Sequence, residues 1–136
     1  MTAVVASVER AISQAQIDAY ADASGDHNPI HVNPAFAAAT PFAGTIAHGM
    51  LVLALIGELM HAAHDDAWLR AGRLKVRFKA PTRPGDTVTA SATVAKETAD
   101  AIEYAVRCAN QRGEVLIEGR ATVPMEDTRP RVSDAA

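Results

Sequence analysis

The sequence predicts an α+β domain in which one long central helix packs against an antiparallel sheet of about five strands. Two observations lead to this fold class. Residues 48–64, HGMLVLALIGELMHAAH, are too long for one strand and apolar nearly all round in their first half, which indicates a buried helix. The second half of the chain instead alternates between apolar and polar residues in segments separated by short polar turns, which is typical of half-buried strands.

The alternating segments predict four strands, and a segment near the N-terminus can supply a fifth. RLKVRFK shows the pattern best, because its apolar residues alternate strictly with cations. Short connections favour an antiparallel meander in which each strand pairs with the next, its apolar face covering the central helix. The five expected strands are residues 4–9, 73–79, 87–95, 101–108 and 115–123.

A helix is expected before the first polar loop. Ser13 and Gln16 have the spacing of a capping box, and Ile12 and Ile17 have that of a hydrophobic staple, so the helix should begin at Ser13. Gly25 should end it.

The loop that follows, SGDHNPIHVNPAF at residues 24–36, is polar and expected to be rigid. Pro29 and Pro34 each fix their own φ and restrict the asparagine before them, so the backbone over residues 26–31 should hold one shape. Pro34 also suits the first turn of a short helix that continues to about Ala39.

Composition restricts the classes of partner. The chain has 136 residues, a length that suits one domain, expected over residues 1–123, with a polar, disordered tail at 124–136. A formal net charge of −3 disfavours nucleic acid and anionic lipid as partners. The longest apolar run, residues 49–57, is too short to span a membrane, and no secretory signal begins the chain. The single cysteine, Cys108, is expected in the core and fits a cytoplasmic location.

The pattern G-D-x-N-P-x-H, present from Gly25 to His31, resembles the MaoC-like, or hydratase 2, branch of the hotdog superfamily. The segments GTIAHGMLVLALIG and LKVRFKAPTRPGDTVTA extend the similarity to about residues 13–123. The resemblance implies a hotdog fold, a homodimer with sheets joined edge to edge, and an acyl tunnel near the interface. It also implies reversible hydration of trans-2-enoyl thioesters of coenzyme A or acyl carrier protein to (3R)-hydroxyacyl thioesters.

Such a hydration needs a base for water, an acid for the α-carbon and stabilisation of the thioester oxygen. By motif position, Asp26 and His31 are the catalytic pair: Asp26 accepts the proton of water, while His31 holds the water and donates a proton. The alternative is a capping aspartate and a surface histidine in a turn, which would be the ordinary interpretation without the complete motif.

The resemblance also suggests a substrate-binding set of Gly49, Asn28 and Gly57. The amide of Gly49 should begin the central helix and stabilise the oxyanion, although a glycine there can equally serve close packing. Gly57 stands where well-studied members have a serine, which should affect rate and pocket shape. We expect His48 to be only a helix-terminal or supporting residue.

No cofactor or metal ion is expected, because neither the loop nor the helix has a zinc signature. His61 and His64 should lie near the C-terminus of the helix, where cations suit its dipole. The cationic row on the strand at residues 73–79 fits an exposed face better than a site for coenzyme A phosphates. Two alternatives to a hydratase stay open: a hotdog acyl-thioesterase and a non-catalytic module that binds acyl thioesters.

Overall fold

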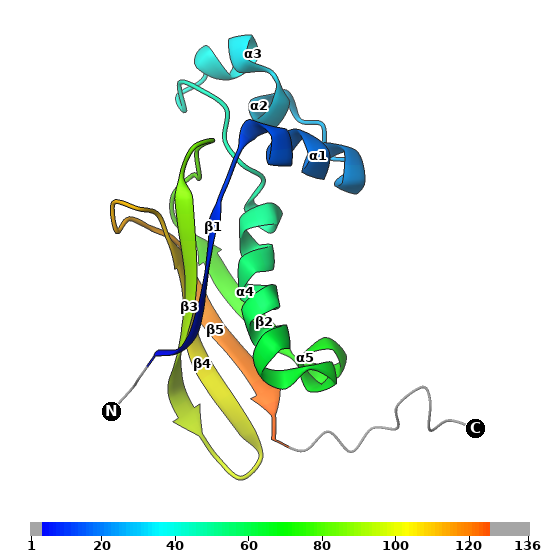
Figure 1. Cartoon of the computed structure of the whole chain (residues 1–136), viewed down its shortest axis with the longest axis vertical. Coiled ribbons are helices and arrows are strands. Elements are labelled where there is room, and N and C mark those ends of the chain that lie inside the picture. Colours follow the sequence, from blue (N-terminus) through cyan, green and yellow to red (C-terminus); the bar gives the residue numbers. More distant parts are fainter. Residues whose placement is uncertain (1–3, 126–136) are drawn as a thin grey trace, which may run out of the picture.

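The computed structural model describes residues 4–125 and shows a five-stranded antiparallel sheet with a long helix, α4, lying against one face (Figure 1). This arrangement confirms the predicted α+β class. The strands are β1 (Val4–Ala11), β2 (Arg73–Phe78), β3 (Thr87–Glu97), β4 (Ala101–Ala109) and β5 (Val115–Pro124). The helices are α1 (Gln14–Ser24), α2 (Pro29–Val32), α3 (Pro34–Ala38), α4 (Gly49–His64) and α5 (Asp66–Ala71).

The order of the strands corrects the expected meander. The sheet runs β1-β3-β4-β5-β2, so β2 pairs with β5 at one edge and not with β3, the next strand in the chain. Residues 79–86 therefore form a crossing link and no hairpin. Eight residues separate the two strands, and an extended chain of that length reaches about 25 Å, enough to pass two strands spaced about 4.8 Å apart. A short polar connection is thus compatible with both topologies.

The core lies between α4 and the inner face of the sheet. The buried side chains of α4 are Val52, Leu55, Ile56, Leu59 and Met60. Complete burial of an aliphatic side chain of this size contributes about 1.5–3 kcal/mol, so this stripe holds the helix in place.

Cys108 faces this core from β4 and is fully buried, as expected. Burial raises the pKa of its thiol to about 12, which makes the side chain a packing group with little thiolate character.

Helices α1, α2 and α3 gather at the end of the sheet where α4 begins, and α5 lies at the other end (Figure 1). The capping box of Ser13 and Gln16 is present, and Gly25 ends α1 in the left-handed region with φ of 80°. Pro34 opens α3, as predicted. The one-turn helix α2 and the helix α5 are additions that the sequence patterns did not predict.

Two sequence expectations concern parts of the chain that are incompletely described. Most of the proposed tail at 124–136 lies outside the described residues, so that prediction stays untested. Over residues 4–125, no helix combines the length and the apolar character needed to cross a bilayer.

The pairing of β2 with β5 depends on Gly119. A Cβ atom there would lie 2.0 Å from the carbonyl oxygen of Lys75 and 2.7 Å from Cα of Val76, and backbone cannot yield to it cheaply. We expect Gly119→Ala to lower the free energy of unfolding by about 2 kcal/mol or more, measured by urea denaturation.

The matched control is Gly57→Ala, because a Cβ at Gly57 meets nothing within 4 Å. Alanine has the higher helix propensity, so this variant should gain about 0.5–1 kcal/mol. Equal stability of the two variants would contradict the assigned register of β2.

Candidate active site

The sequence-predicted catalytic residues meet at the N-terminal end of α4. Asp26 lies in the turn between α1 and α2, His31 lies on α2, and His48 immediately precedes α4. One side-chain polar atom from each of the three lies within 4.8 Å of the others. The structure therefore brings Asp26 and His31 together and adds His48 to them.

The ring of His31 is held in one orientation by a backbone carbonyl. Its Nδ1 lies 2.8 Å from the oxygen of Ile46, and because a carbonyl can only accept, Nδ1 carries the proton of this bond. Gln14 steadies the same turn by donating to the carbonyl of His31 at 2.8 Å. The orientation leaves Nε2 of His31 as the nitrogen that can exchange a proton with a bound molecule.

Asp26 combines an exposed carboxylate with a well-defined turn. Its Oδ1 accepts the backbone N–H of Asn28 at 3.2 Å, and its own N–H donates to Oγ of Ser24 at 3.1 Å. Among the described residues, Oδ2 accepts no hydrogen bond. Asp26 therefore stabilises the turn, as the alternative of a capping aspartate supposed, and its Oδ2 can still accept a proton.

The other histidine of the motif loop takes no part in this cluster. Nε2 of His27 lies 2.9 Å from Oδ1 of Asp22 on α1. That hydrogen bond raises the pKa of His27 above its ordinary value. His27 is directed to the solvent side of α1, which leaves His31 as the histidine of the loop that faces the site.

His48 makes more contacts than the sequence suggested. It is buried, with 3% of its surface exposed, and its ring stacks on that of His31 at a centroid distance of 3.9 Å and an angle of 26°. The ring of Tyr20 lies against it at 4.8 Å, and its Nε2 donates to the carbonyl of Asp26 at 2.9 Å. The available sequence signal was only its place before Gly49, and no local pattern reveals contacts with residues 17 or more positions away.

The same stacking argues against a metal ion between Asp26, His31 and His48. An imidazole nitrogen binds a metal ion in the plane of its ring, at about 2.0–2.1 Å for zinc. Two nearly parallel rings 3.9 Å apart cannot both direct a nitrogen at one ion. The arrangement suits proton exchange better than metal coordination.

A pocket of about 390 Å³ lies beside this cluster, and both His31 and Gly49 line it. Gly49 is the first residue of α4, so its N–H has no partner inside the helix and lies at the positive end of the helix dipole. The walls include Phe42, Phe78 and Thr82. A mostly apolar pocket with a donor at the helix end can hold a polarised carbonyl.

The absence of a side chain at Gly49 makes room for Phe78. A Cβ there would lie 2.7 Å from Cε1 of that ring. Close packing, one of the two roles expected for Gly49, is therefore present, and it is compatible with the other role because the amide stays at the pocket.

The other two predicted substrate-binding residues, Asn28 and Gly57, are not among the residues that line this pocket. Asn28 caps α2, its Oδ1 accepting the N–H of Ile30 at 3.1 Å. Gly57 lies eight residues beyond Gly49 on α4, or about 12 Å along the axis. The structure does not bring Gly57 to the pair of Asp26 and His31, and its part in binding stays a prediction, as does that of Asn28.

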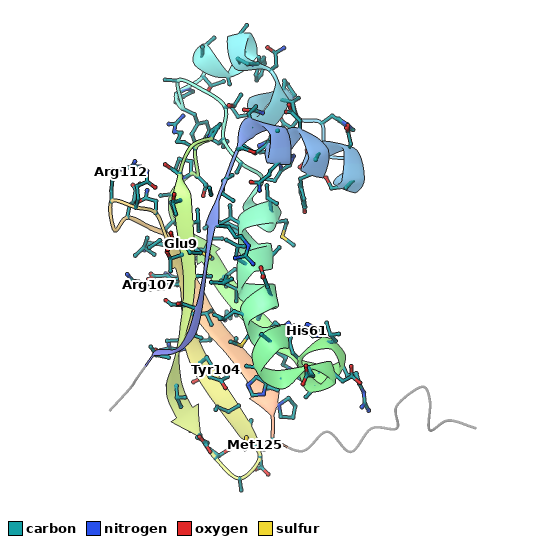
Figure 2. All side chains as sticks on the ribbon, in the orientation of Figure 1. Glu9, His61, Tyr104, Arg107, Arg112 and Met125 are labelled. Atoms are coloured by element: carbon teal, nitrogen blue, oxygen red, sulfur yellow. The ribbon has the colours of Figure 1, made fainter. Side chains whose placement is uncertain are left out.

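The two histidines of the last turn of α4 lie far from this cluster. His61 and His64 are in the last turn of α4, as expected, and His61 appears at the end of the helix remote from α1–α3 (Figure 2). Nε2 of His64 lies 2.7 Å from the hydroxyl of Tyr104, and burial lowers the pKa of His64. This pair belongs to the opposite end of the molecule.

The cationic row on β2 is exposed, as predicted, on the face of the sheet away from α4. A hollow of about 600 Å³ over that face is lined by Lys75, Arg77, Arg107 and Arg120, and Figure 2 shows Arg107 on this side. Although larger than the pocket at His31, the hollow lies across the sheet from Asp26 and His31. Lys79 follows the row and lines the smaller pocket, with Glu118 3.4 Å from its ammonium.

The fold and the site together define a hotdog-fold protein with an acid–histidine site at the N-terminus of its central helix. A model of the MaoC like domain family matches residues 2–111, and the chain belongs to this family. The solved (R)-hydratase from A. caviae superposes with a TM-score of 0.76 and 30% identity, covering 93% of this chain and 95% of that one.

Two named relatives are similar in sequence. The (R)-specific enoyl-CoA hydratase of Rhodospirillum rubrum is 38% identical over 120 residues, which is 87% of this chain and 83% of that protein. The 3-hydroxyacyl-thioester dehydratase Z of Mycobacterium tuberculosis is 42% identical over 87 residues. That match covers 61% of this chain and only 58% of the relative, so the chain spans less than two thirds of its length.

The contact between Gly49 and Phe78 leads to a prediction on stability. In the wild type, Gly49→Ala combines a gain in helix propensity with displacement of the Phe78 ring, which is 55% exposed and can move. In a Phe78→Ala background only the gain remains, so the same substitution should be more favourable by about 1 kcal/mol. A double-mutant cycle in urea measures this difference, and a coupling near zero would contradict the packing role.

Proposed function

We propose that this protein catalyses the reversible hydration of trans-2-enoyl thioesters to (3R)-hydroxyacyl thioesters. The observation that carries the proposal is the placement of Asp26 and His31 within 4.8 Å of each other beside a pocket that begins at the N-terminus of α4. Membership of the MaoC-like family and the names of the two hydratase relatives support it.

In the proposed reaction, a water molecule lies between the carboxylate of Asp26 and Nε2 of His31. Its oxygen attacks C3 of the enoyl group, one water proton passes to Asp26, and the π electrons move to the thioester oxygen as an enolate. The N–H of Gly49 stabilises that oxygen. The proton that Asp26 took from water then passes by way of Nε2 of His31 to C2, so that both side chains return to their starting state as the thioester carbonyl reforms. Imidazole changes protonation near neutral pH more readily than other side chains.

The pocket also supports the choice of substrate class. Phe42, Val52, Phe78 and Ile117 make its walls largely apolar, which suits an acyl chain, while His31 and Gly49 mark its polar end. We propose a thioester of coenzyme A or acyl carrier protein as the substrate, because either carrier supplies the same reacting group.

We further propose that the protein is a homodimer whose sheets join through β2. This strand lies at an edge of the sheet, so its outer side is unpaired within the described chain. The exposed apolar side chains of Met50 and Phe78 lie on α4 and at the end of β2. Sedimentation at micromolar concentration, with β2 charge variants as a control, tests this assembly.

One assay distinguishes the candidate activities. Crotonyl-coenzyme A and longer enoyl substrates are incubated with the protein, and loss of enoyl absorbance and release of thiol are followed separately. Hydration without thiol release supports the proposal. Thiol release would identify a thioesterase, and binding without turnover would identify a non-catalytic module.

The stereochemistry of the product provides a second prediction. Asp26 and His31 belong to one proline-stiffened segment, which delivers water to one face of the double bond, and the family resemblance assigns that face to the (3R) product. Chiral chromatography of the hydrolysed product should show the (3R) acid in large excess. A predominantly (3S) product would contradict the assignment of the motif.

The catalytic pair is tested by substitution. Asp26→Asn and His31→Ala should each lower turnover by about 10²- to 10⁴-fold. The double variant should be scarcely worse than the more damaged single variant, because both groups act on one water. Circular dichroism and thermal melting must show that the variants are folded, since Asp26 also forms the turn before Asn28. Losses that multiply as independent effects would refute a joint role.

A further inference from the structure

We infer that His48 is a positioning residue for Asp26 and His31, an inference that rests on the hydratase function proposed above. It acts through two contacts: a hydrogen bond to the carbonyl of Asp26 and a ring stack against His31. Neither contact places it on the substrate. Of the three clustered residues only His31 lines the pocket, and neither Asp26 nor His48 does.

Three segments of the chain meet at the ring of His48. Tyr20 reaches it from α1, the carbonyl of Asp26 from the turn, and the ring of His31 from α2. His48 itself precedes Gly49, so its backbone is joined directly to the buried helix α4. The ring therefore connects the motif loop to the part of the molecule that the core holds most firmly.

The protonation of His48 follows from its partners. A carbonyl oxygen only accepts, so Nε2 carries the proton shared with Asp26. Nδ1 is buried and has no hydrogen-bond partner among the described residues.

His48 therefore acts as a hydrogen-bond donor that holds the carbonyl of Asp26 in place. Its ring, stacked at a centroid distance of 3.9 Å, also restricts the rotation of His31, so that Nε2 of His31 keeps its direction. Displacement of a reacting group by about 1 Å can cost roughly 10²-fold in rate.

The two contacts can be separated by substitution. His48→Phe keeps the flat ring beside His31 and removes the donor, whereas His48→Gln keeps an N–H donor near the position of Nε2. We expect His48→Phe to lower kcat by about 10- to 100-fold with little change in KM, and His48→Gln to recover most of that loss. The matched control is His61→Phe, the same substitution in the last turn of α4, which should leave kcat unchanged.

A double-mutant cycle shows whether His48 acts through Asp26. The Asp26→Asn variant lacks the carboxylate that His48 is proposed to position. In this background His48→Phe should therefore have almost no further effect on kcat. Thermal melting establishes that all variants are folded. An equal loss in both backgrounds, an unrepaired loss in His48→Gln, or a change confined to KM would overturn the positioning role.

The tautomer of His48 is tested without any reaction. In ¹⁵N-labelled protein, one imidazole spin system should show a proton on Nε2, and should disappear in His48→Gln. An Nε2 of His48 that carries no proton would overturn the inference even if hydration is observed. An Nε2–H ring in a protein without hydratase activity would instead refute the proposed function.

Discussion

The burial of α4 against the inner face of the sheet is the interaction on which the other features depend. Val52, Ile56 and Met60 fill the space between the layers, and the association of these apolar surfaces fixes both the axis and the start of the helix. The amide of Gly49, part of the pocket wall and the ring of His48 all belong to that start.

The segment that carries α2 and α3, near the start of α4, acquires a defined geometry mainly through polar contacts. Asn28 and Asn33 accept backbone N–H groups at the first turns of α2 and α3, and a proline follows each. The prolines reduce the number of conformations available to the unfolded segment, and the asparagine caps satisfy backbone N–H groups in the folded one. Gln14 and His48 then attach the segment to α1 and to α4. The polar residues of the motif thus fix the shape of the segment in addition to the proton transfer proposed for Asp26 and His31.

The crossing link between β2 and β3 has consequences for the site as well as for the topology. Residues 79–86 pass over the end of the sheet, and the carbonyl of Thr82 accepts the N–H of Ala47 at 2.8 Å. Lys79, Ala80 and Pro81 become walls of the pocket. A simple β2–β3 hairpin would have left the N-terminus of α4 open on this side. The strand order that the meander prediction missed therefore supplies one wall of the pocket.

Local rules in the sequence by themselves determined the boundaries of α1, α3 and α4, the alternation of the strands and the motif of Asp26 and His31, because capping, periodicity and proline geometry act over a few residues. Strand order, the contacts of His48 and the distance of Gly57 from the motif were decided only in the tertiary structure. Each depends on contacts between segments that are distant in the chain, and the burial of α4 against the sheet determines which segments come into contact. The same alternating strand pattern is compatible with several strand orders, and the sequence around His48 does not indicate which rings will pack against it.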